Sequence, residues 1–282
     1  MKRLSLLVLL AMISGAQAQD ALDPSVTVVP YADVEWSPLN PARGDASPRA
    51  GALWGDRTSG EASGFLVQFA EGFASPPHIH NVTYRGVVIR GLVHNDDPDA
   101  APMWMPPGSY WTQPAGEAHV TSAEGTVNLA YIEIQEGPYL VRPTEQAFDN
   151  GERPLNVDAS NLVWLDAATV SWIDPSPVPS AAEATVLWGN PRDGAPSGLL
   201  VRLPASSEAT LHGLGPTLRT VVLAGRVSVE PPAAGGVDLP PGSYVGSTGP
   251  AAHAFVCGPE GACLLYVRAE GGLQIIPGPS TR

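Results

Sequence analysis

Positive charge is scarce in this 282-residue sequence, which has 15 lysine and arginine residues against 28 aspartate and glutamate residues. Lys2 is the only lysine, and the formal net charge is −13 at pH 7. A surface this acidic repels phosphate backbones and anionic lipid head groups. We therefore expect neither nucleic acid nor a membrane among the partners of this protein.

Long apolar runs are confined to the first residues, MKRLSLLVLLAMISGAQA, where Lys2 and Arg3 precede an apolar stretch that ends in Ala16 and Ala18. This layout is typical of a secretory signal peptide, and we expect cleavage after Ala18. No cysteine follows the apolar run, which argues against a lipoprotein anchor. No later stretch approaches the roughly 20 apolar residues of a membrane span. The sequence predicts an exported protein, periplasmic or extracellular, that loses residues 1–18.

Cysteine is nearly absent, because Cys257 and Cys263 in the segment CGPEGAC are the only two. Gly-Pro-Glu-Gly between two apolar runs is typical of a hairpin loop, which brings the two thiols across from each other. In an oxidising compartment we expect a disulfide between them, and two unpaired thiols are the alternative. The short loop favours a structural cross-link over a redox role.

The composition also disfavours long helices. The chain contains 30 glycines and 30 prolines, and proline breaks helix interiors. The apolar segments are short, rich in valine, isoleucine and leucine, and bounded by Gly, Pro, Asn and Asp; examples are GFLVQF, GVVIRGLV, TVNLAYIEI, GLLVRL and RTVVLAGRVSV. Such segments are typical of β-strands. The sequence predicts an all-β protein.

The chain repeats itself at an offset of 134 residues. ALWGDRTSGEASGFLV (52–67) aligns with VLWGNPRDGAPSGLLV (186–201), and PPGSY occurs once in each copy. Matches of this density indicate an internal duplication. We expect two similar β domains, one over residues 19–150 and one over 151–282, each with enough strands for a small barrel or sandwich.

The first copy carries His78 and His80, one residue apart, at the start of a β-branched run. Side chains at positions i and i+2 of a strand share one face, so both imidazoles can face a barrel interior. His119, expected on a neighbouring strand, completes three nitrogen ligands and leaves coordination positions open for water or substrate. Taken singly, each histidine is more often a surface or hydrogen-bonded residue; together they predict a catalytic or ligand-receiving metal site.

The spacing around these histidines resembles the two signature motifs of the cupin superfamily. GFASPPHIHNVTYRGVVIRG fits the first motif at every fixed position except its glutamate, which is Tyr84 here. GSYWTQPAGEAHVTSA fits the second motif except its final asparagine, which is Ala123 here. The resemblance covers both copies and implies two tandem cupin barrels, also called double-stranded β-helix or jelly-roll folds.

Tyr84 stands where cupins supply a carboxylate ligand, and a phenol with a pKa of about 10 is a poor ligand unless the metal deprotonates it. Three roles remain open for it: a phenolate ligand, a hydrogen-bond donor to a bound oxygen or substrate, or a residue that only fills volume. Without the carboxylate, a divalent ion leaves the site positively charged, which favours an anionic or enolate-forming ligand. Some cupin oxygenases likewise use three histidines and no acidic ligand.

The second copy keeps only part of this set. At the 134-residue offset, His212 and His253 take the places of the first and third histidines, and Leu214 and Leu218 replace the second histidine and the tyrosine. We expect His212 and His253 to make ordinary hydrogen bonds rather than to bind a metal. The first copy is then the working domain and the second a scaffold.

Together these features predict an exported two-cupin protein with one divalent ion, Zn, Fe(II), Mn or Ni, at His78, His80 and His119. The ion would bind and activate a small oxygen-rich or anionic molecule by dioxygenase-like chemistry or by metal-assisted isomerisation or hydrolysis, with Tyr84 as the candidate catalytic residue. The alternative is a non-catalytic periplasmic cupin that binds or senses a ligand or metal. Barrel edges in the superfamily often pair between chains, so the resemblance is also compatible with a homodimer.

Overall fold

The computed structural model of the chain describes residues 26–175, 182–229 and 237–278. Within these ranges nearly all regular structure is β-strand, and the helices are short 3₁₀ segments, so the all-β prediction is confirmed. No helix in this part of the chain has the length and apolar character that crossing a membrane requires. The signal-peptide prediction concerns residues 1–18, which lie outside the described residues.

The elements follow one another in two comparable series. The first series is β1 (Val26–Val29), η1 (Tyr31–Asp33), β2 (Trp36–Pro38), η2 (Pro41–Ala46), β3 (Arg49–Trp54), β4 (Ser63–Phe69), β5 (Ile79–His80), β6 (Tyr84–Asp96), β7 (Tyr110–Gln113), β8 (Val120–Ile134), β9 (Val141–Arg142) and η3 (Thr144–Gln146). The second is β10 (Leu155–Val157), η4 (Ala159–Asn161), β11 (Glu183–Trp188), β12 (Ser197–Leu203), β13 (Glu208–Gly213), β14 (Thr217–Ala224), β15 (Val227–Val229), β16 (Val237–Leu239), β17 (Tyr244–Thr248), β18 (Ala251–Cys257), β19 (Cys263–Glu270) and β20 (Leu273–Pro277).

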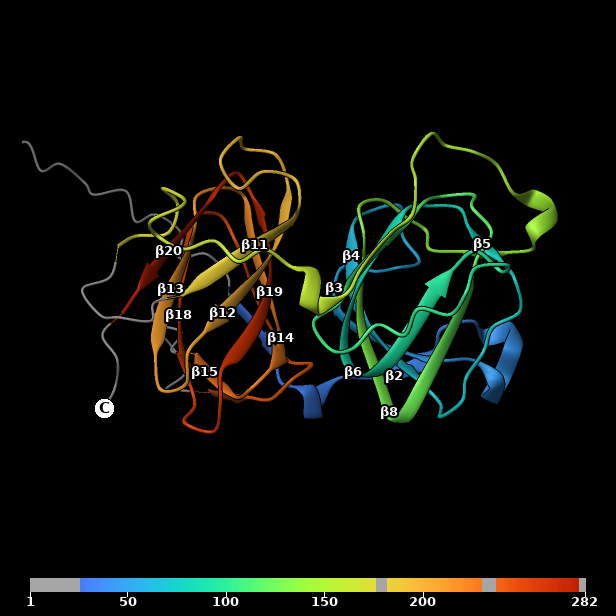
Figure 1. Cartoon of the computed structure of the whole chain (residues 1–282), viewed down its shortest axis with the longest axis horizontal. Coiled ribbons are helices and arrows are strands. Elements are labelled where there is room, and N and C mark those ends of the chain that lie inside the picture. The colour runs from blue at the N-terminus through green and yellow to red at the C-terminus, as the bar shows by residue number, and fades with distance from the viewer. Residues whose placement is uncertain (1–25, 176–181, 230–236, 279–282) are drawn as a thin grey trace, which may run out of the picture.

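The strands form two jelly-roll barrels, which Figure 1 shows beside each other, the first mainly in blue to green and the second mainly in yellow to red. The first barrel is built on the sheet β10-β7-β6-β8-β4-β3-β2, with the small pair β5-β9 at one end. The second contains the sheets β1-β17-β14-β19-β12-β11 and β16-β15-β18-β13-β20. Register shifts on either side of Arg90 bend the long pair β6–β8 of the first barrel around its interior.

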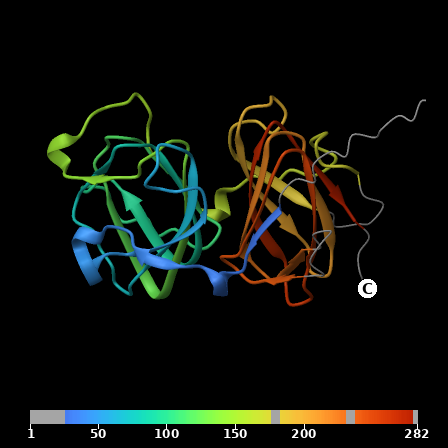
Figure 2. The same cartoon turned by 180° about the vertical axis from the view of Figure 1, so that it is seen from behind.

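One strand of each series pairs with a strand of the other barrel. β1 pairs with β17, with Val28 opposite Val245, and Figure 2 shows this blue strand against the second barrel. β10 pairs with β7, with Asn156 opposite Trp111. The predicted division of the chain at residues 150 and 151 remains a prediction, and these two strands cross it.

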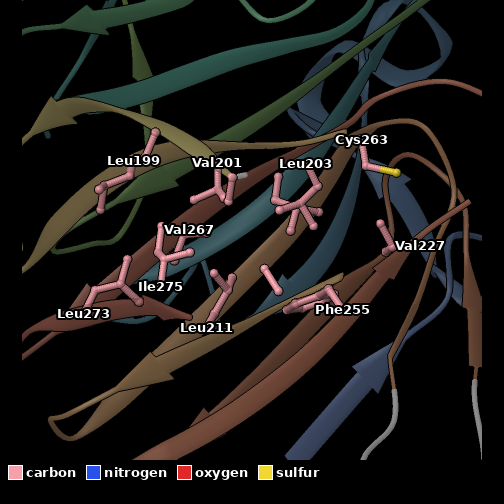
Figure 3. Close-up of a cluster of buried hydrophobic side chains, with 14 of the residues drawn as sticks. Leu199, Val201, Leu203, Leu211, Val227, Phe255, Cys263, Val267, Leu273 and Ile275 are labelled. Carbon is pink, nitrogen blue, oxygen red and sulfur yellow. The ribbon is translucent and has the colours of Figure 1, made fainter. Parts of the chain in front are cut away.

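The core of the second barrel shows why its strands are apolar almost throughout. Figure 3 shows Leu199, Val201 and Leu203 of β12 in the buried cluster inside this barrel. Leu200, which points to the other face of the strand, belongs to a different cluster that includes residues of both barrels. β12 is therefore buried on both faces, which explains the continuous apolar run GLLV.

The cluster between the barrels has an approximate two-fold symmetry that follows from the duplication. Arg85 lies over the ring of Trp188, 4.3 Å from its centroid, and Arg219 lies over that of Trp54 at 4.1 Å. Residues 85 and 219, like 54 and 188, stand at the 134-residue offset. These stacked arginine–tryptophan contacts tie each barrel to the other.

One buried ion pair breaks this symmetry. Glu133 and Arg268 lie two residues after the equivalent tyrosines Tyr131 and Tyr266, and their side chains are only 1% and 2% exposed. An Arg268 nitrogen lies 3.5 Å from a carboxylate oxygen of Glu133 and another lies 2.9 Å from Glu270. Without Arg268 the carboxylate of Glu133 would be a buried charge with no cation beside it, which is strongly destabilising, so this pair favours the docked arrangement of the barrels.

The hairpin between β18 and β19 carries the two cysteines. A disulfide joins Cys257, the last residue of β18, to Cys263, the first residue of β19. It closes the short loop between these two strands of the second barrel.

Candidate metal centre

The three histidines predicted as ligands lie together in the first barrel. Their ligand atoms all fall within 4.8 Å of one another. His78 and His119 form a β-bridge, because each donates its backbone N–H to the carbonyl of the other at 3.0 Å. His80, in β5, places its ring centroid 5.1 Å from that of His78 and 5.3 Å from that of His119. Backbone pairing thus brings residues 41 positions apart (119 minus 78) onto one interior face.

Every one of the three rings is held through Nδ1 by a backbone carbonyl. His78 Nδ1 lies 2.9 Å from the carbonyl oxygen of Pro76, and His80 Nδ1 lies 3.1 Å from that of Leu140. His119 Nδ1 lies 3.1 Å from the carbonyl oxygen of Glu117.

A carbonyl oxygen can only accept a hydrogen bond, so these contacts fix the proton on Nδ1 and leave Nε2 with a free lone pair. Imidazoles that bind metals are oriented in this way by a hydrogen bond on the other nitrogen. The donor set therefore fits a divalent metal ion.

Burial keeps these imidazoles neutral. Desolvation, followed by the nearby charge of His78, lowers the pKa of His119 to about 3. Desolvation also lowers the pKa of His80 well below its ordinary value, and lowers that of His78. All three rings are unprotonated near neutral pH, which is the form that binds metals.

Tyr84 belongs to a buried polar network behind His119. Its hydroxyl donates to Asn95 Oδ1 at 2.8 Å and lies 3.3 Å from His119 Nε2. Asn95 in turn donates to Gln113 at 2.9 Å, and Gln113 donates to the same Glu117 carbonyl that holds His119. The shorter contact shows that the phenolic proton is donated to Asn95. The lone pairs of the Tyr84 oxygen therefore remain available on the side of His119, where an ion would bind.

Burial raises the pKa of Tyr84 well above that of a free phenol. The side chain is therefore a neutral phenol in the absence of a metal ion. Its catalytic role stays a prediction, as does the assignment of the three histidines as metal ligands.

Tyr139 is a site residue that the sequence does not reveal. Its ring stacks on His80 with a centroid separation of 4.2 Å and an interplanar angle of 21°. Its hydroxyl lies 3.2 Å from His80 Nε2 and donates to this unprotonated nitrogen. A phenol therefore lies beside the Nε2 atoms of both His80 and His119. Tyr139 comes from the loop after β8, which lies outside both cupin motifs, and a lone tyrosine in a loop carries no signal for such a role.

A cavity of about 330 Å³ opens onto the histidines. His78, His80 and Tyr84 line it, and its walls are mostly apolar; they include Val67, Phe69, Phe73, Trp111, Ile132 and Tyr139. This volume is at the small end of the range for ligand sites in proteins. The site thus combines three clustered imidazoles with a small, mostly apolar chamber.

The second barrel does not repeat this geometry. Its strand pairing sets Leu211, not His212, opposite His253. The expected equivalence of His212 with the first histidine of the motif is therefore wrong by one residue. Such a slip turns the side chain to the opposite face of the strand, and His212 is accordingly half-exposed.

The interior position two residues after Leu211 is Gly213 instead of a histidine. A Cβ atom there would lie 2.8 Å from Cβ of Leu218, which fills the adjacent space. His253, 3% exposed, faces the interior, but neither of its ring nitrogens has a hydrogen-bond partner. The ordinary hydrogen bonds expected for His253 are thus absent among the described residues, and it is a buried polar remnant.

Comparison with known protein families identifies the family of this chain. The model of a domain of unknown function, DUF4437, matches residues 27–276. The chain belongs to this family. Among curated proteins, none matches the sequence.

Solved structures show the same fold at low sequence identity. A presumed dioxygenase from Nostoc punctiforme is 15% identical with a TM-score of 0.62, covering 86% of this chain and 81% of that one. Salicylate 1,2-dioxygenase from Pseudaminobacter salicylatoxidans is 13% identical with a TM-score of 0.57, covering 90% and 88%. Procruciferin, an 11S globulin from Brassica napus, is 10% identical with a TM-score of 0.52, covering 92% and 87%. The cupin-like fold of this DUF4437 protein is shared with proteins of different kinds, so it does not decide the activity.

The histidine geometry predicts a metal content that one substitution abolishes. Protein purified without a histidine tag is expected to contain about one divalent ion per chain, because three imidazoles form an open site. His80→Ala should lower this content at least tenfold, whereas His212→Ala should leave it unchanged. Elemental analysis by mass spectrometry measures the content, and retention of the ion by His80→Ala would show that it binds elsewhere.

The unpaired His253 predicts a pH dependence of stability. Burial lowers the pKa of His253 to about 4, whereas the unfolded chain takes up a proton near its ordinary value of 6.5. As the pH falls below 6.5 the unfolded state therefore binds the proton first, and stability is lost. Between pH 8 and pH 5 this histidine contributes a loss of about 2 kcal/mol. His253→Leu should remove that share in urea denaturation; equal losses in variant and wild type would contradict the assignment.

Proposed function

We propose that this protein is an exported two-cupin metalloprotein that binds a divalent ion at His78, His80 and His119 and acts as an oxygenase on a small oxygen-rich or anionic molecule. The observation that carries the proposal is the clustering of one ligand nitrogen from each of three histidines within 4.8 Å, with every Nδ1 beside a backbone carbonyl oxygen. A bound ion supplies Lewis-acid polarisation of a substrate oxygen and, as Fe(II), one-electron chemistry with dioxygen.

The groups around the histidines favour oxygenation over hydrolysis or isomerisation. Among the described residues that line the cavity there is no aspartate or glutamate that could serve as a general base. The two phenols, Tyr84 and Tyr139, have pKa values raised by burial and are protonated at neutral pH. With the imidazoles bound to the ion and the phenols protonated, the described lining offers no side chain that is free to abstract a proton. The shared fold with salicylate 1,2-dioxygenase is compatible with this chemistry.

The residues around the site would have two roles: some would bind the ion, and others would form the walls around the bound molecule. The three imidazoles bind the ion and leave part of its coordination sphere facing the cavity. Tyr84, fixed by Asn95, presents its oxygen beside His119. The apolar walls exclude water from the reacting end of a bound molecule.

The same lack of an acid–base pair supports a second candidate, a non-catalytic cupin that binds or senses a ligand in the periplasm. In that case the metal would serve only to hold the ligand. The two candidates share the site and differ in turnover alone.

Oxygen consumption distinguishes them. Protein reconstituted anaerobically with Fe(II) is mixed with air-saturated buffer and a panel of catechols, diketones and hydroxylated benzoates. At least one compound should give oxygen uptake together with a ring- or chain-cleaved product. Uptake should fall at least a hundredfold in His80→Ala and stay unchanged in His212→Ala.

Tyr84→Phe tests the catalytic role within the same assay. The variant should retain the ion and show a lower kcat at an unchanged KM, because the phenol oxygen is lost without loss of the ring. Tight ligand binding with no uptake for any compound, under Fe(II) or other divalent ions, would contradict the enzyme and support the binding protein.

A further inference from the structure

Two arginines, Arg43 and Arg142, line the cavity that opens onto the histidines. Arg43 lies in η2, and its guanidinium carbon is 5.9 Å from the ring centroid of Phe73, another residue of the cavity wall. Arg142 lies in β9 and pairs with Ile79, the residue between the first two histidines. Two segments far apart in the sequence thus bring positive charge to one cavity.

Neither guanidinium forms an ion pair with a carboxylate of the described residues. The ion pairs in these ranges involve other arginines, all of them outside the cavity; they are Arg153, Arg202, Arg226 and Arg268. In a chain with almost twice as many acidic as basic residues, the described lining of this cavity holds two arginines and no acidic side chain. They create a positive potential that attracts a small anion and offer planar donors that match a carboxylate.

The remainder of the chamber suits an apolar body. Phe69, Phe73 and Trp111 contribute aromatic walls, and the described lining contains no acidic side chain that would repel an anion. A volume of about 330 Å³ accommodates a single ring or a short chain rather than a nucleotide or a peptide.

We infer that the cavity selects small monocarboxylates with an apolar body. Arg43 and Arg142 bind the carboxylate, and the body lies along the aromatic wall of the same cavity. The assignment deepens the proposed function and rests on it only for the reaction that follows binding.

The test compares matched probes on the full-length protein. Benzoate, the uncharged benzamide of nearly the same shape, and acetate, which lacks the ring, are titrated by calorimetry into metal-free and zinc-loaded protein. Benzoate should bind at least tenfold tighter than either of the other two probes, because only benzoate combines the charge with the ring. The preference should be present in metal-free protein, since the arginines and not the ion hold the carboxylate.

Variants identify the groups responsible. The double substitution Arg43→Gln with Arg142→Gln should reduce the preference for benzoate over benzamide to less than twofold and leave the zinc content unchanged. Arg192→Gln, which removes the same charge from an exposed loop of the second barrel, should keep the full preference.

The inference is overturned if benzamide binds as tightly as benzoate, if the double variant keeps the preference, or if benzoate binds no more tightly than acetate. It is also overturned if the preference appears only with zinc, because the carboxylate then binds the ion. Failure of the proposed function has a different signature. A protein that takes up no ion at the histidines but still prefers benzoate in its metal-free form retains the carboxylate site and loses only the metal centre.

Discussion

The antiparallel bridge between His78 and His119 is the constraint from which the rest of the site follows. A β-ladder places directly opposed side chains on one face, so the register alone decides whether two imidazoles meet. The two barrels provide an internal comparison, because they share a fold and an origin. In the second barrel the register sets Leu211 opposite His253, and the histidine set is lost although two of its members remain in the sequence. The one-residue slip and the loss of the second histidine together separate the three-histidine cluster of the first barrel from the apolar interior of the second.

The orientation of the histidine rings is fixed by hydrogen bonds to groups that would not themselves bind the ion. Three backbone carbonyls fix the tautomers, and one of them, that of Glu117, also accepts from Gln113. Gln113 connects through Asn95 to Tyr84, so the phenol and His119 are parts of one network. The scaffold is stiffened further by the second barrel, which contributes the buried Arg268 to the interface. The second copy thus supports the first without repeating its chemistry.

Much of this arrangement can be predicted from the sequence, because it depends on local spacing. Strand identity follows from short apolar runs between turn residues, and the histidine set follows from the two motif spacings. The error at His212 came from aligning the copies without a gap. The alternation of Ala209, Leu211 and Gly213 as buried residues shows that His212 faces the other way, and this period-two pattern was available in the sequence.

Other features could not be predicted, because they depend on contacts between distant segments. Three residues of the cavity wall lie in segments that neither cupin motif includes; they are Tyr139, Arg43 and Arg142. The exchange of β1 and β10 between the barrels has the same origin, since pairings such as Val28 with Val245 and Trp111 with Asn156 join segments that are distant in the sequence and leave no local signal.

Anomalous diffraction from crystals of the metal-loaded protein, recorded at the absorption edge of the bound element, tests the central claim most directly. We expect one dominant peak inside the first barrel, about 2.0–2.1 Å from the Nε2 atoms of His78, His80 and His119, with no equivalent peak at His253. A peak bound through Nδ1, or one located away from these three rings, would contradict it.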